Sequence, residues 1–452
     1  MPQASRQRMH IGFDDTDSTR KGCTTYVAAL LVEELEKLKA SFLDYPSLIR
    51  LNPNVPWKTR GNGALCLRIE YDGALEEKIK ECTVNLVEAQ SDLEWKGTDP
   101  GIVFLKTPEI PQEVTAFAKK AITGIVTLKE AMQLIRKFHA EAIGYNTRRG
   151  IIGALAAIGE TLTKDHTFEL IAYRAPDNFG KKRQVNEESI FKMDEALQPY
   201  TFNNVDKEKH RVIITPRGLD PILFGIRGET PEIVKKAYAM VKPLERIERW
   251  VIFRSNQGTD AHLAKVTALS QIQPYSSVIA KGTVSKNPRV IPLRHVIFTV
   301  KDETAEVDCA AYEPTGSLRK IARELTIGDK VEVYGAARKP SQGKPLTINL
   351  EKINVLQLAQ QNQQRNPVCL ECGKRLKSMG RNQGFRCEKC GKRFNNLPKI
   401  EVPTKRALKL ELYVTSTRSQ RHLTKPLTRY GMEKHGKAAA KLNENWHSKA
   451  SP

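Results

Sequence analysis

Two closely spaced cysteine pairs constrain this chain of 452 residues more than any other feature. Cys369 and Cys372 form one Cys-x2-Cys pair, Cys387 and Cys390 form the other, and 14 residues separate the pairs. Each pair can make a tight turn that presents two thiolates, and four thiolates suit one tetrahedral zinc ion. A closed shell of four sulfurs leaves no position for a reacting water, so the spacing predicts a structural zinc ribbon. Two disulfides or an iron–sulfur centre are the alternatives.

The net charge indicates a polyanionic partner. The chain has 73 Lys and Arg against 51 Asp and Glu, a formal charge of +22. Neutralisation of phosphates by Lys and Arg supplies most nonspecific nucleic-acid affinity. The last 52 residues hold 11 Lys and Arg and 4 Glu, so most of the excess lies elsewhere. Basic residues also surround the cysteine pairs, which indicates that the ribbon contacts nucleic acid: Lys374, Arg375, Lys377, Arg381, Arg386, Lys389, Lys392 and Arg393.

Cysteine usage and hydropathy favour a cytoplasmic protein. Outside the pairs, Cys23, Cys66, Cys82 and Cys309 are scattered, as in chains kept in a reducing compartment. No run approaches the length of about 18 apolar residues that a membrane helix needs. The N-terminal segment has no apolar core of a signal peptide before its first acidic cluster. We expect no membrane partner.

The order of predicted elements gives a multidomain chain of mixed α/β and α+β class. Apolar periodicity predicts an α/β domain over 8–163. A strand-helix-strand-strand-helix-strand order then predicts a ferredoxin-like domain over 164–268, with Thr230 as the N-cap of its second helix. Five strands with a helix after the third, over 269–356, match an OB-fold barrel, a common single-strand nucleic-acid module.

Three shorter segments complete the chain. A Gln- and Asn-rich linker over 357–367 cannot support a core. The zinc ribbon follows over 368–400, and a basic C-terminal extension occupies 401–452. Four lysines of this extension lie among Ala, Gly and Asn, which predicts a solvated segment that touches RNA: Lys434, Lys437, Lys441 and Lys449.

An acidic loop near the start of the chain is the strongest catalytic candidate. A short apolar strand runs directly into Asp14, Asp15 and Asp17. Carboxylates at the end of a strand can hold magnesium jointly with ATP phosphates. A solvated acidic turn is the first alternative. A second is a phosphatase with Asp15 as nucleophile, because the spacing to Asp17 matches the first motif of haloacid-dehalogenase-type phosphotransferases. That family needs a downstream acidic motif, and Gly328-Asp329 lies in the predicted barrel.

Neighbouring segments supply phosphate-binding chemistry. Gly22 and Cys23 precede Thr24 and Thr25 at a predicted helix N-terminus, where free N–H groups favour a phosphate and a hydroxyl can accept a phosphoryl group. An N-cap role for either threonine is the alternative. A basic loop before a strand, and a glycine with an arginine that opens a helix, add further candidates: Lys58, Thr59, Arg60, Gly61, Asn62, Arg149 and Gly150.

Taken together, these motifs resemble those of the archaeal tRNA agmatinylcytidine synthetase family. The resemblance covers about 8–400 and depends on the conjunction of five segments: Ile11–Ser18, Gly22–Thr25, Pro53–Gly63, Gly150–Gly159 and Ser255–His262. It implies a kinase-like catalytic domain followed by a ferredoxin-like domain, an OB fold and a zinc ribbon.

The resemblance also implies a reaction. A ligase of this kind cleaves ATP to AMP and pyrophosphate, phosphorylates the 2-oxygen of the wobble cytidine, and joins agmatine to that carbon. Its substrate would be the isoleucine tRNA with a CAU anticodon, which then reads AUA codons. ATP, magnesium and structural zinc are the implied cofactors. A noncatalytic OB-fold and zinc-ribbon nucleic-acid-binding protein is the alternative from a different class.

Residue roles follow from the same resemblance. The threonine that becomes phosphorylated corresponds to Thr24, and the acidic loop would hold magnesium, with Asp14 or Asp15 also able to act as base. Gly22, Thr25 and the basic candidates above are expected to bind ATP or phosphate. Agmatine is cationic in solution and needs an acidic pocket, so we expect its contacts at Asn256, Gln257 and Asp260, in the turn after the last ferredoxin-like strand.

Overall fold

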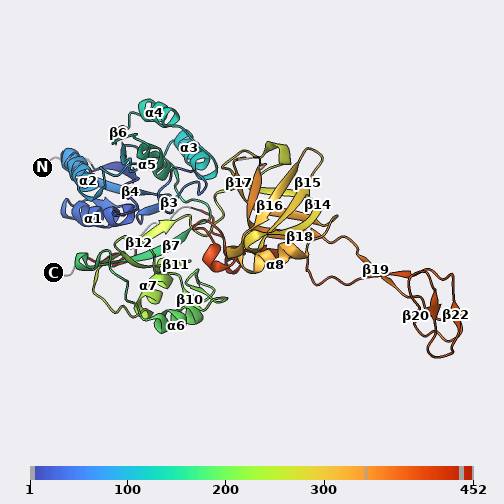
Figure 1. The fold of residues 1–452 in the computed structure, drawn as a ribbon. Helices are drawn as coiled ribbons and strands as arrows, with labels where there is room; N and C mark the ends of the chain where they lie inside the picture. The colour runs from blue at the N-terminus through green and yellow to red at the C-terminus, as the bar shows by residue number, and fades with distance from the viewer. Residues whose placement is uncertain (1–5, 342, 344, 437–441, 450–452) are drawn as a thin grey trace.

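The computed structural model describes residues 6–341, 343, 345–436 and 442–449. Figure 1 shows two domains side by side at one end, a barrel in the middle and a small three-stranded unit at the far end of an extended arm. The chain thus follows the predicted order of modules. The N-terminus and the C-terminus both lie beside the first two domains.

The first domain is a sheet with helices on both faces. Its strands are β1 (Arg6–Asp14), β2 (Ser41–Phe42), β3 (Ser47–Arg50), β4 (Gly63–Asp72), β5 (Gly101–Leu105) and β6 (Glu141–Gly144), and its helices are α1 (Thr24–Lys37), α2 (Glu76–Gln90), α3 (Gln112–Thr123), α4 (Leu128–Lys137) and α5 (Gly150–Gly159). The order β6-β5-β1-β4-β3 is antiparallel throughout. Alternate residues of β4 enter different cores, since Leu65 packs with α1 and α2 whereas Cys66 packs with α3, α4 and α5.

Glycines let α5 lie directly on the sheet. A Cβ at Gly12 of β1 would come within 2.2 Å of the Ala154 carbonyl oxygen. A Cβ at Gly101 of β5 would come within 2.0 Å of the Ile151 amide nitrogen. No side chain fits at either position, so the backbone of α5 contacts β1, which ends at the acidic loop, and β5, which begins beside it.

The second domain contains β7 (Thr167–Arg174), α6 (Glu187–Leu197), β8 (Thr201–Phe202), β9 (Val205–Asp206), β10 (Arg211–Val212), β11 (Ile222–Gly228), α7 (Pro231–Met240) and β12 (Ile247–Ser255). The predicted ferredoxin-like order is present, and Thr230 caps α7 by accepting a bond from the Ile233 amide. From its apolar residues the sequence predicts the second strand of this order near 211–215, and that position is wrong. β10 pairs with β9 outside the main sheet, and the short β8 takes the edge position beside β11.

The two domains share one sheet. β12 pairs with β3 in parallel, with Arg254 opposite Ser47 and Ser255 opposite Leu48, so the order β6-β5-β1-β4-β3-β12-β7-β11-β8 is continuous. Arg254 is fully buried at this junction. Its guanidinium donates to Asp44 Oδ2 at 2.7 Å and to the Leu162 carbonyl oxygen at 2.7 Å. The first two domains are therefore joined through backbone hydrogen bonds as well as side chains.

The barrel agrees closely with the predicted OB fold. It contains β13 (Leu263–Lys265), β14 (Ser277–Ile291), β15 (His295–Lys301), β16 (Glu306–Ala311), α8 (Ser317–Glu324), β17 (Lys330–Arg338) and β18 (Thr347–Gln357). Antiparallel pairing of β14 with β17 closes the barrel around its own apolar core.

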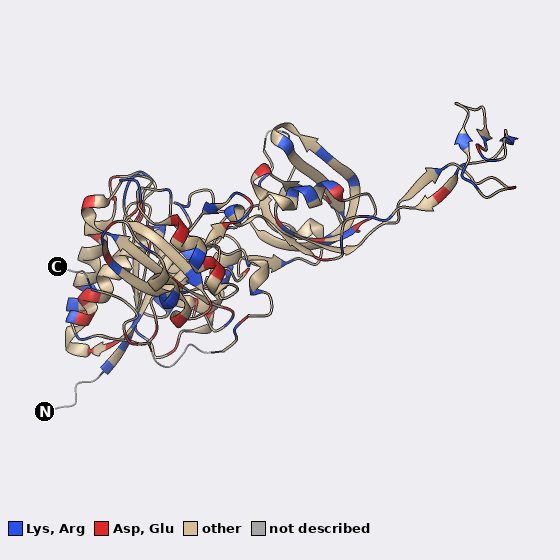
Figure 2. Cartoon of the chain, turned by 90° about the horizontal axis from the view of Figure 1, so that it is seen from below, with Lys and Arg blue, Asp and Glu red and all other residues tan. Residues whose placement is uncertain are grey.

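The predicted linker is partly ordered. β19 (Asn362–Arg365) pairs with β23 (Ile400–Pro403) into an exposed two-stranded arm, which carries the ribbon strands β20 (Lys377–Ser378), β21 (Phe385–Arg386) and β22 (Arg393–Phe394). Backbone pairing is the main contact in this arm, as expected for a segment with few apolar side chains. Figure 2 shows Lys and Arg on every part of the chain, including the ribbon at the end of the arm.

The C-terminal segment returns to the main body of the molecule. We define it as residues 405–436 and 442–449. Its strand β24 (Leu412–Val414) pairs with β18 of the barrel, Leu423 and Arg429 are buried against the second domain, and Trp446 packs on Phe42 and Tyr45 of the first. The prediction of a solvated extension is therefore wrong for most of the described tail.

Ion pairing explains this error. Lys434 donates to Glu229 Oε2 at 2.6 Å and to the His166 carbonyl oxygen at 3.0 Å, whereas Lys449 stays largely exposed. The predicted positions Lys437 and Lys441 lie outside the described residues. The acidic partners come from the second domain, about 200 residues earlier, so local composition does not reveal them.

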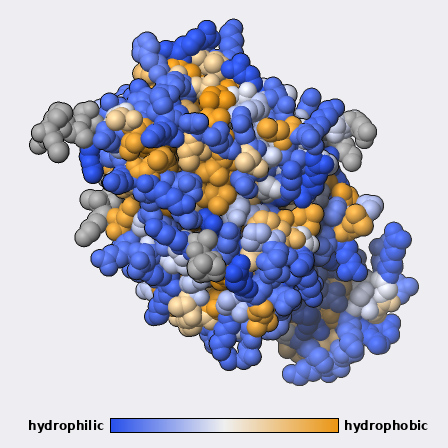
Figure 3. Space-filling model, turned by 90° about the vertical axis from the view of Figure 1, so that its left-hand side faces the viewer, coloured by the Kyte–Doolittle hydropathy of each residue, from blue (hydrophilic) through white to orange (hydrophobic). Residues whose placement is uncertain are grey.

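The surface agrees with the mixed composition. Figure 3 shows a largely hydrophilic face with smaller apolar patches over the first two domains. None of the helices in the described part of the chain combines the length and apolar character needed to cross a membrane.

A buried histidine in β1 gives a stability prediction. His10 is 5% exposed, and its ring lies 3.1 Å from Arg68 Nη1 and 3.1 Å from the Thr107 carbonyl oxygen. Burial, followed by the Arg68 charge, lowers the pKa of His10 to about 3. The unfolded chain, with a His pKa of about 6.5, binds one more proton across this window, so stability should fall as the pH drops from about 6.5 towards 3.

We expect the substitution His10→Asn to reduce this dependence by about 1 kcal/mol per pH unit between about pH 6 and pH 4. Urea unfolding at several pH values, followed by tryptophan fluorescence, measures the slope. Equal slopes for the two proteins would contradict the neutral, buried state of His10.

Candidate active site

The antiparallel register of the first domain assembles the acidic loop with two other segments. Asp14, the last residue of β1, lies opposite Gly101 at the start of β5, and β4 begins on the other side of β1 at Gly63. The residues just before those strands, 59–62 and Asp99, therefore meet the loop that follows β1. This edge of the sheet differs from that of a parallel α/β sheet, because strand beginnings, and not only strand ends, flank the carboxylates.

Asp14 and Asp15 are held in a crowded, poorly solvated position. Asp15 adopts a positive φ of 61° and accepts bonds from Thr59 Oγ1 at 3.1 Å and from the Asp99 amide at 3.2 Å. Burial raises the pKa of Asp15 to about 7. Burial and the neighbouring Asp15 charge raise the pKa of Asp14 well above its ordinary range. The site thus concentrates carboxyl groups whose charged form is disfavoured by burial, and among the described residues Asp14 forms no ion pair.

The third carboxylate has a basic partner. Asp17 Oδ2 lies 3.4 Å from Arg60 Nε, and burial raises the pKa of Asp17 against the opposing effect of that guanidinium. Arg60 also donates to the carbonyl oxygens of Ser18, at 2.9 Å, and Gly22, at 3.2 Å. Arg60 therefore stabilises the whole acidic loop, and its predicted role near phosphate is combined with a structural one.

A buried carboxylate that the sequence analysis missed anchors the far side of the loop. Asp92 is 1% exposed and accepts bonds from Ser18 Oγ at 2.7 Å and from Arg20 at 2.6 and 2.7 Å. These bonds, with that from Arg20 first, lower the pKa of Asp92 below its ordinary range despite burial. Asp92 lies in a polar segment after α2 that shows no motif, so only the fold reveals its contact with the loop.

Thr24 lies at the start of α1, close to the acidic loop. The N-cap of α1 is Cys23, with no side-chain capping bond, so the alternative that Thr24 or Thr25 caps the helix is wrong. Thr16 Oγ1 donates to Thr24 Oγ1 at 3.0 Å, while Thr25 Oγ1 lies 3.1 Å from Cys23 Sγ. Gly22 has a positive φ of 85°, and a Cβ there would lie 2.9 Å from the Thr16 carbonyl oxygen.

Two cavities lie on either side of these residues. The acidic-loop cavity, about 90 Å³, is lined by all three carboxylates together with Trp57, Lys58, Thr59, Asn62, Arg149, Gly150 and Gly153. The interdomain cavity, about 260 Å³, lies between the first and second domains and is lined by Asp17, Thr24, Thr25, Arg60, Gly61 and Asn62 from the first. Asp17 and the loop before β4 line both spaces. The structure therefore brings together every predicted catalytic residue and most of the predicted phosphate-binding residues.

Several predicted phosphate ligands also have structural partners. Arg149 donates to Asp99 Oδ2 at 3.0 and 2.6 Å, and Lys58 Nζ donates to the Arg60 carbonyl oxygen at 3.0 Å. A Cβ at Gly150 would lie 2.3 Å from the Gly101 amide nitrogen, so this glycine is needed for packing of α5 on β5. Asn62 donates to the Asn52 carbonyl oxygen at 2.7 Å.

The three residues expected to bind agmatine lie at junctions between domains. The Asn256 amide bonds to both the N–H and the carbonyl oxygen of Arg50, at 2.8 and 3.0 Å, and extends the pairing of β12 with β3. Gln257 Nε2 donates to Glu169 Oε2 at 2.5 Å. Asp260 accepts from Lys352 Nζ of the barrel and from the Lys425 amide, at 2.7 Å for the latter. None of the three lines either of the cavities defined above.

The far wall of the interdomain cavity contains functional candidates that the sequence analysis missed. Glu169 of β7, Arg227 of β11 and Asp220 come from the second domain, and His422 comes from the C-terminal segment. Only an alternation of polar and apolar residues marks Glu169 and Arg227 in their strands, and nothing local marks His422. A larger basic groove, about 910 Å³, opens beside this cavity and is lined by Arg211, Arg217, Arg418 and Arg421 among others.

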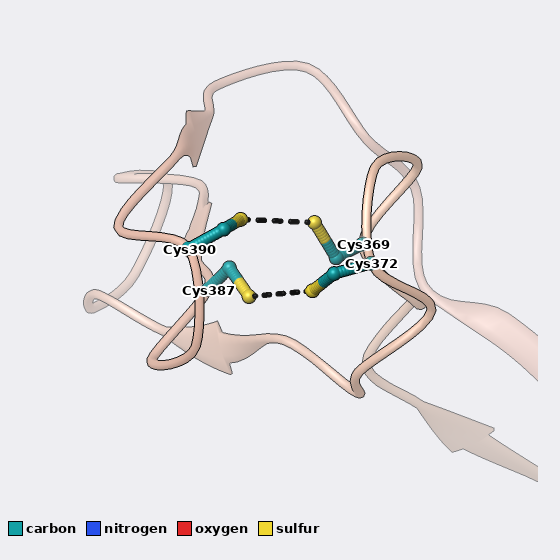
Figure 4. Close-up of side chains that lie close together, drawn as sticks. All are labelled: Cys369, Cys372, Cys387 and Cys390. Atoms are coloured by element: carbon teal, nitrogen blue, oxygen red, sulfur yellow. Dashed lines mark hydrogen bonds between the residues drawn. The ribbon is translucent and has the colours of Figure 1, made fainter.

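The four paired cysteines form the predicted metal centre. Their sulfurs all lie within 4.8 Å of one another, and Figure 4 shows the four side chains converging from two facing turns. The Sγ–Sγ distances of 3.5 Å for Cys369–Cys390 and 3.4 Å for Cys372–Cys387 exclude the disulfide alternative in this structure. The Cys390 backbone N–H is the first of the groups that lower the pKa of Cys387, to about 6, which favours the thiolate that zinc requires.

Comparisons with known proteins agree with this arrangement. Family models match four consecutive segments: the TiaS TCKD domain at 10–147, the TiaS FLD domain at 148–262, an OB-fold nucleic acid binding domain at 278–356 and the TiaS C-terminal zinc ribbon domain at 366–408.

A relative and two solved structures extend these matches to nearly the full length. The isoleucine tRNA 2-agmatinylcytidine synthetase TiaS of Methanocaldococcus jannaschii is 44% identical over 426 residues, which cover 93% of this chain and 98% of the relative. A crystal structure of TiaS in complex with its isoleucine tRNA and ATP is 40% identical, with a TM-score of 0.83 and coverage of 94% and 97%. A complex of TiaS with the same tRNA, AMPCPP and agmatine is 37% identical, with a TM-score of 0.81 and the same coverage.

The fold, the site and these matches define a multidomain enzyme in which a catalytic α/β domain is joined to nucleic-acid-binding modules. The chain belongs to the TiaS family of isoleucine tRNA 2-agmatinylcytidine synthetases. The family resemblance inferred from the five motifs is thereby confirmed.

The phosphatase alternative finds no support in the site. Both oxygens of Asp15 accept bonds from protein donors. Asp329, the downstream acid that alternative would need, lies in the barrel, where its Oδ2 accepts from Arg406 Nη2 at 2.8 Å. The noncatalytic alternative is likewise not favoured, because the matches extend over the catalytic domain.

Close packing of α5 gives a test of the acidic loop. A Cβ at Gly153 would lie 1.8 Å from Asp14 Oδ2, so Gly153→Ala must displace the carboxylate. We expect ATP cleavage to fall by about 100-fold, because a displacement of about 1 Å in a catalytic site can have that effect. Labelled ATP measures the rate. Lys119→Ala is the control, since this exposed side chain of α3 lies outside both cavities; equal loss in both variants would contradict the role of Asp14.

The ribbon gives a second test. Cys372→Ser removes one of four thiolate ligands, so we expect loss of bound zinc and a fall of at least about 10-fold in tRNA affinity, because the basic residues of the ribbon lose their fixed arrangement. Metal analysis and filter binding measure these effects, and part of the ATP cleavage should remain. Cys82→Ser, outside the cluster, is the matched control. Unchanged tRNA binding after zinc loss would rule out a contact between ribbon and tRNA.

Proposed function

We propose that this protein is an ATP-dependent ligase that joins agmatine to the 2-carbon of the wobble cytidine in the isoleucine tRNA with a CAU anticodon. ATP would be cleaved to AMP and pyrophosphate, and the γ-phosphoryl group of that pyrophosphate would pass by way of Thr24 to the cytosine 2-oxygen. Agmatine would then expel this oxygen as phosphate, so that AMP and two phosphates are the final products. The observation that carries this proposal is the single site that joins three carboxylates, a buried threonine hydroxyl and an interdomain cavity in a member of the TiaS family. The 2-agmatinylcytidine product lets the tRNA read AUA codons.

The lining of the acidic-loop cavity suits ATP chemically, whereas its volume of about 90 Å³ holds only part of a nucleotide, which would extend beyond it. The backbone at Gly150 and the side chains of Lys58 and Arg149 bring positive charge to one side of this cavity, and Trp57, Ile125 and Ile152 supply apolar surface for a base. The family relative bound to its isoleucine tRNA and ATP supports nucleotide use by this domain. We assign Gly22, Thr25, Thr59, Arg60, Gly61 and Asn62 to the same nucleotide and phosphate environment.

Magnesium fits the carboxylates. Asp14, Asp15 and Asp17 offer oxygen ligands, and the raised pKa values of all three indicate that the protein compensates their charge only in part, even where Arg60 faces Asp17. These oxygens do not form a group as close as the four cysteine sulfurs among the described residues, which favours an ion held jointly with phosphate oxygens. Such an ion would offset the charge on the phosphates during transfer. Zinc, by contrast, would stay in the ribbon as a structural ion.

Thr24 is the proposed phosphoryl acceptor. Its hydroxyl lies at the N-terminus of α1, where free backbone N–H groups favour a phosphate, and it lines the interdomain cavity next to Asp17. Thr16 Oγ1 donates to Thr24 Oγ1, which leaves the Thr24 proton free for transfer to a base. Asp15, with its pKa raised to about 7, or Asp14 would accept this proton.

Agmatine fits the interdomain cavity better than the positions assigned from the sequence. The cavity combines apolar surface from Leu48, Ile171 and Ile214 with the carboxylates of Asp17, Glu169 and Asp220. An aliphatic chain with a cationic end needs both. Gln257 contributes through its bond to Glu169, whereas Asn256 and Asp260 would act by fixing the domains around the cavity.

The remaining assignments complete the proposal. We assign the catalytic domain to 8–163, the ferredoxin-like domain to 164–268, the OB fold to 269–356, the linker to 357–367, the ribbon to 368–400 and the basic extension to 401–452. The basic groove beside the interdomain cavity is a suitable path for the RNA backbone, and the target base would leave the anticodon stack to enter the cavity. The tRNA substrate and the free state of the cysteines, which is typical of a reducing compartment, favour a cytoplasmic location.

The direct test is mass spectrometry of the wobble nucleoside after incubation of the isoleucine tRNA with protein, ATP and agmatine. We expect 2-agmatinylcytidine, AMP formation that tRNA stimulates, and label from γ-phosphate-labelled ATP on Thr24. Thr24→Val keeps the shape and removes the hydroxyl, so both label and product should disappear. Thr123→Val, at the end of α3, should retain both. Product formation by Thr24→Val would reject the acceptor role of this residue.

A further inference from the structure

Four side chains that are distant in sequence meet at the far wall of the interdomain cavity, three of them lining it and Gln257 lying outside the lining. Glu169 Oε1 accepts from Arg227 Nε at 3.1 Å, and Glu169 Oε2 accepts from Gln257 Nε2 at 2.5 Å. Both donors also contact His422: Arg227 Nη2 lies 2.8 Å from His422 Nδ1, and Gln257 Oε1 lies 3.1 Å from the same nitrogen. We call this group the Glu169 ring. It joins β7, β11, the turn after β12 and the C-terminal segment.

The partners of His422 Nδ1 indicate which imidazole nitrogen accepts. A guanidinium only donates hydrogen bonds and an amide oxygen only accepts them, so His422 Nδ1 can bond to Arg227 Nη2 or to Gln257 Oε1 but not to both. We assign the lone pair of Nδ1 to the shorter contact, with Arg227, which places the ring proton on Nε2. Burial, followed by the charges of Arg50 and Arg227, lowers the pKa of His422 well below its ordinary range, in agreement with a neutral imidazole. The neutral ring can fix Arg227 without adding a competing positive charge next to Glu169.

Glu169 faces the cavity from this ring. Its side chain is among those that line the space, and it is only 4% exposed as a residue. The neighbouring Gly225 leaves room for it, because a Cβ there would lie 2.9 Å from Glu169 Oε1. With one donor on each oxygen, the carboxylate plane is set, and its remaining lone pairs are available to a cationic ligand.

The backbone of the C-terminal segment fixes His422 in place. The Gly258 amide donates to the His422 carbonyl oxygen at 2.8 Å, and the Asp260 amide donates to the Leu423 carbonyl oxygen at 2.8 Å. Further along, Thr424 Oγ1 donates to Glu351 Oε2 of the barrel at 2.7 Å. The turn after β12 thus holds the segment that completes the ring, so neither is free to move independently of the cavity wall.

We propose that His422 is a positioning residue that, through Arg227, orients the Glu169 carboxylate towards the cationic end of the amine substrate. The inference rests on the proposed function, since it assigns the interdomain cavity to agmatine. It gives the C-terminal segment, beyond the zinc ribbon, a specific part in amine binding.

Two substitutions of similar chemistry separate positioning from packing. The Oδ1 atom of Asn takes the place of imidazole Nδ1, whereas the amide of the longer Gln reaches the place of Nε2. In the full-length, zinc-loaded protein, we expect His422→Gln and His422→Ala to raise the KM for agmatine by about 10-fold, because an acceptor for a charged donor is lost. His422→Asn should stay within about 3-fold of the unchanged protein, and the KM for ATP should change little in all three.

Leu427→Ala is the matched control, since this exposed side chain lies on the same segment outside the ring. Glu169→Gln should raise the KM for agmatine by itself, and adding His422→Gln to it should have no further effect. Thermal unfolding checks that the variants fold, and His422→Gln retains most of the volume if His422→Ala does not.

The outcomes are distinct. An unchanged KM for agmatine in His422→Gln, or equal increases in the Asn and Gln variants, would overturn the positioning role in favour of packing alone. Calorimetric titration of agmatine into the full-length variants measures their agmatine affinities without turnover, and these should follow the same order as the KM values. If the unchanged protein binds agmatine but makes no modified nucleoside, the proposed reaction fails. The agmatine affinities of the Asn and Gln variants relative to the unchanged protein still decide the role of His422. If it binds no agmatine, both fail.

Discussion

The parallel pairing of β3 with β12 is the interaction on which the rest of the molecule depends. It converts two domains into one continuous sheet and sets the distance between the acidic loop and the strands β7 and β11. Arg254 and Asn256 reinforce the junction from either side of the pairing, through Asp44 and the Arg50 backbone. Because the interdomain cavity lies across this junction, its two walls are held as rigidly as neighbouring strands of one sheet. Thr24, the proposed phosphoryl acceptor, and Glu169, a carboxylate 145 positions later in the chain, therefore line the same cavity.

Close backbone contact is the second constraint. Gly12, Gly101, Gly150 and Gly153 let α5 approach the end of β1 and the start of β5, and this places Asp14 against the helix in a partly buried position. This packing buries three carboxylates and raises their pKa values, so their charged form is unfavourable in the free protein. A site of this kind gains most from ligands that bring positive charge or take up protons, which is what ion-assisted phosphoryl transfer requires.

Motifs with local geometry could be predicted from the sequence, and contacts between distant segments could not. The Cys-x2-Cys pairs, the acidic loop at the end of a strand and the Thr230 cap each depend on a few neighbouring residues, and the structure contains all three groupings. The ferredoxin-like and OB-fold orders follow from hydrophobic periodicity. The short β8 could not be predicted because two residues show no period. Asp92, Glu169 and His422 were missed because each acts through partners 70 or more positions away. The Ser255–His262 turn is expected at the ligand from its motif, yet its polar side chains mainly satisfy buried groups at domain junctions.

The return of the C-terminal segment has a consequence for synthesis of the protein. During translation the first domain, the second domain and the barrel emerge in order, and each has a core of its own. Arg429, however, must still pair with Asp165 and Glu229, and His422 must still reach Arg227. A nascent chain therefore carries an unfinished pocket until the segment that contains these two residues leaves the ribosome exit tunnel, whose length adds further delay. Any transcript that ends early would yield a protein with its first domain formed and the proposed amine pocket open on one side.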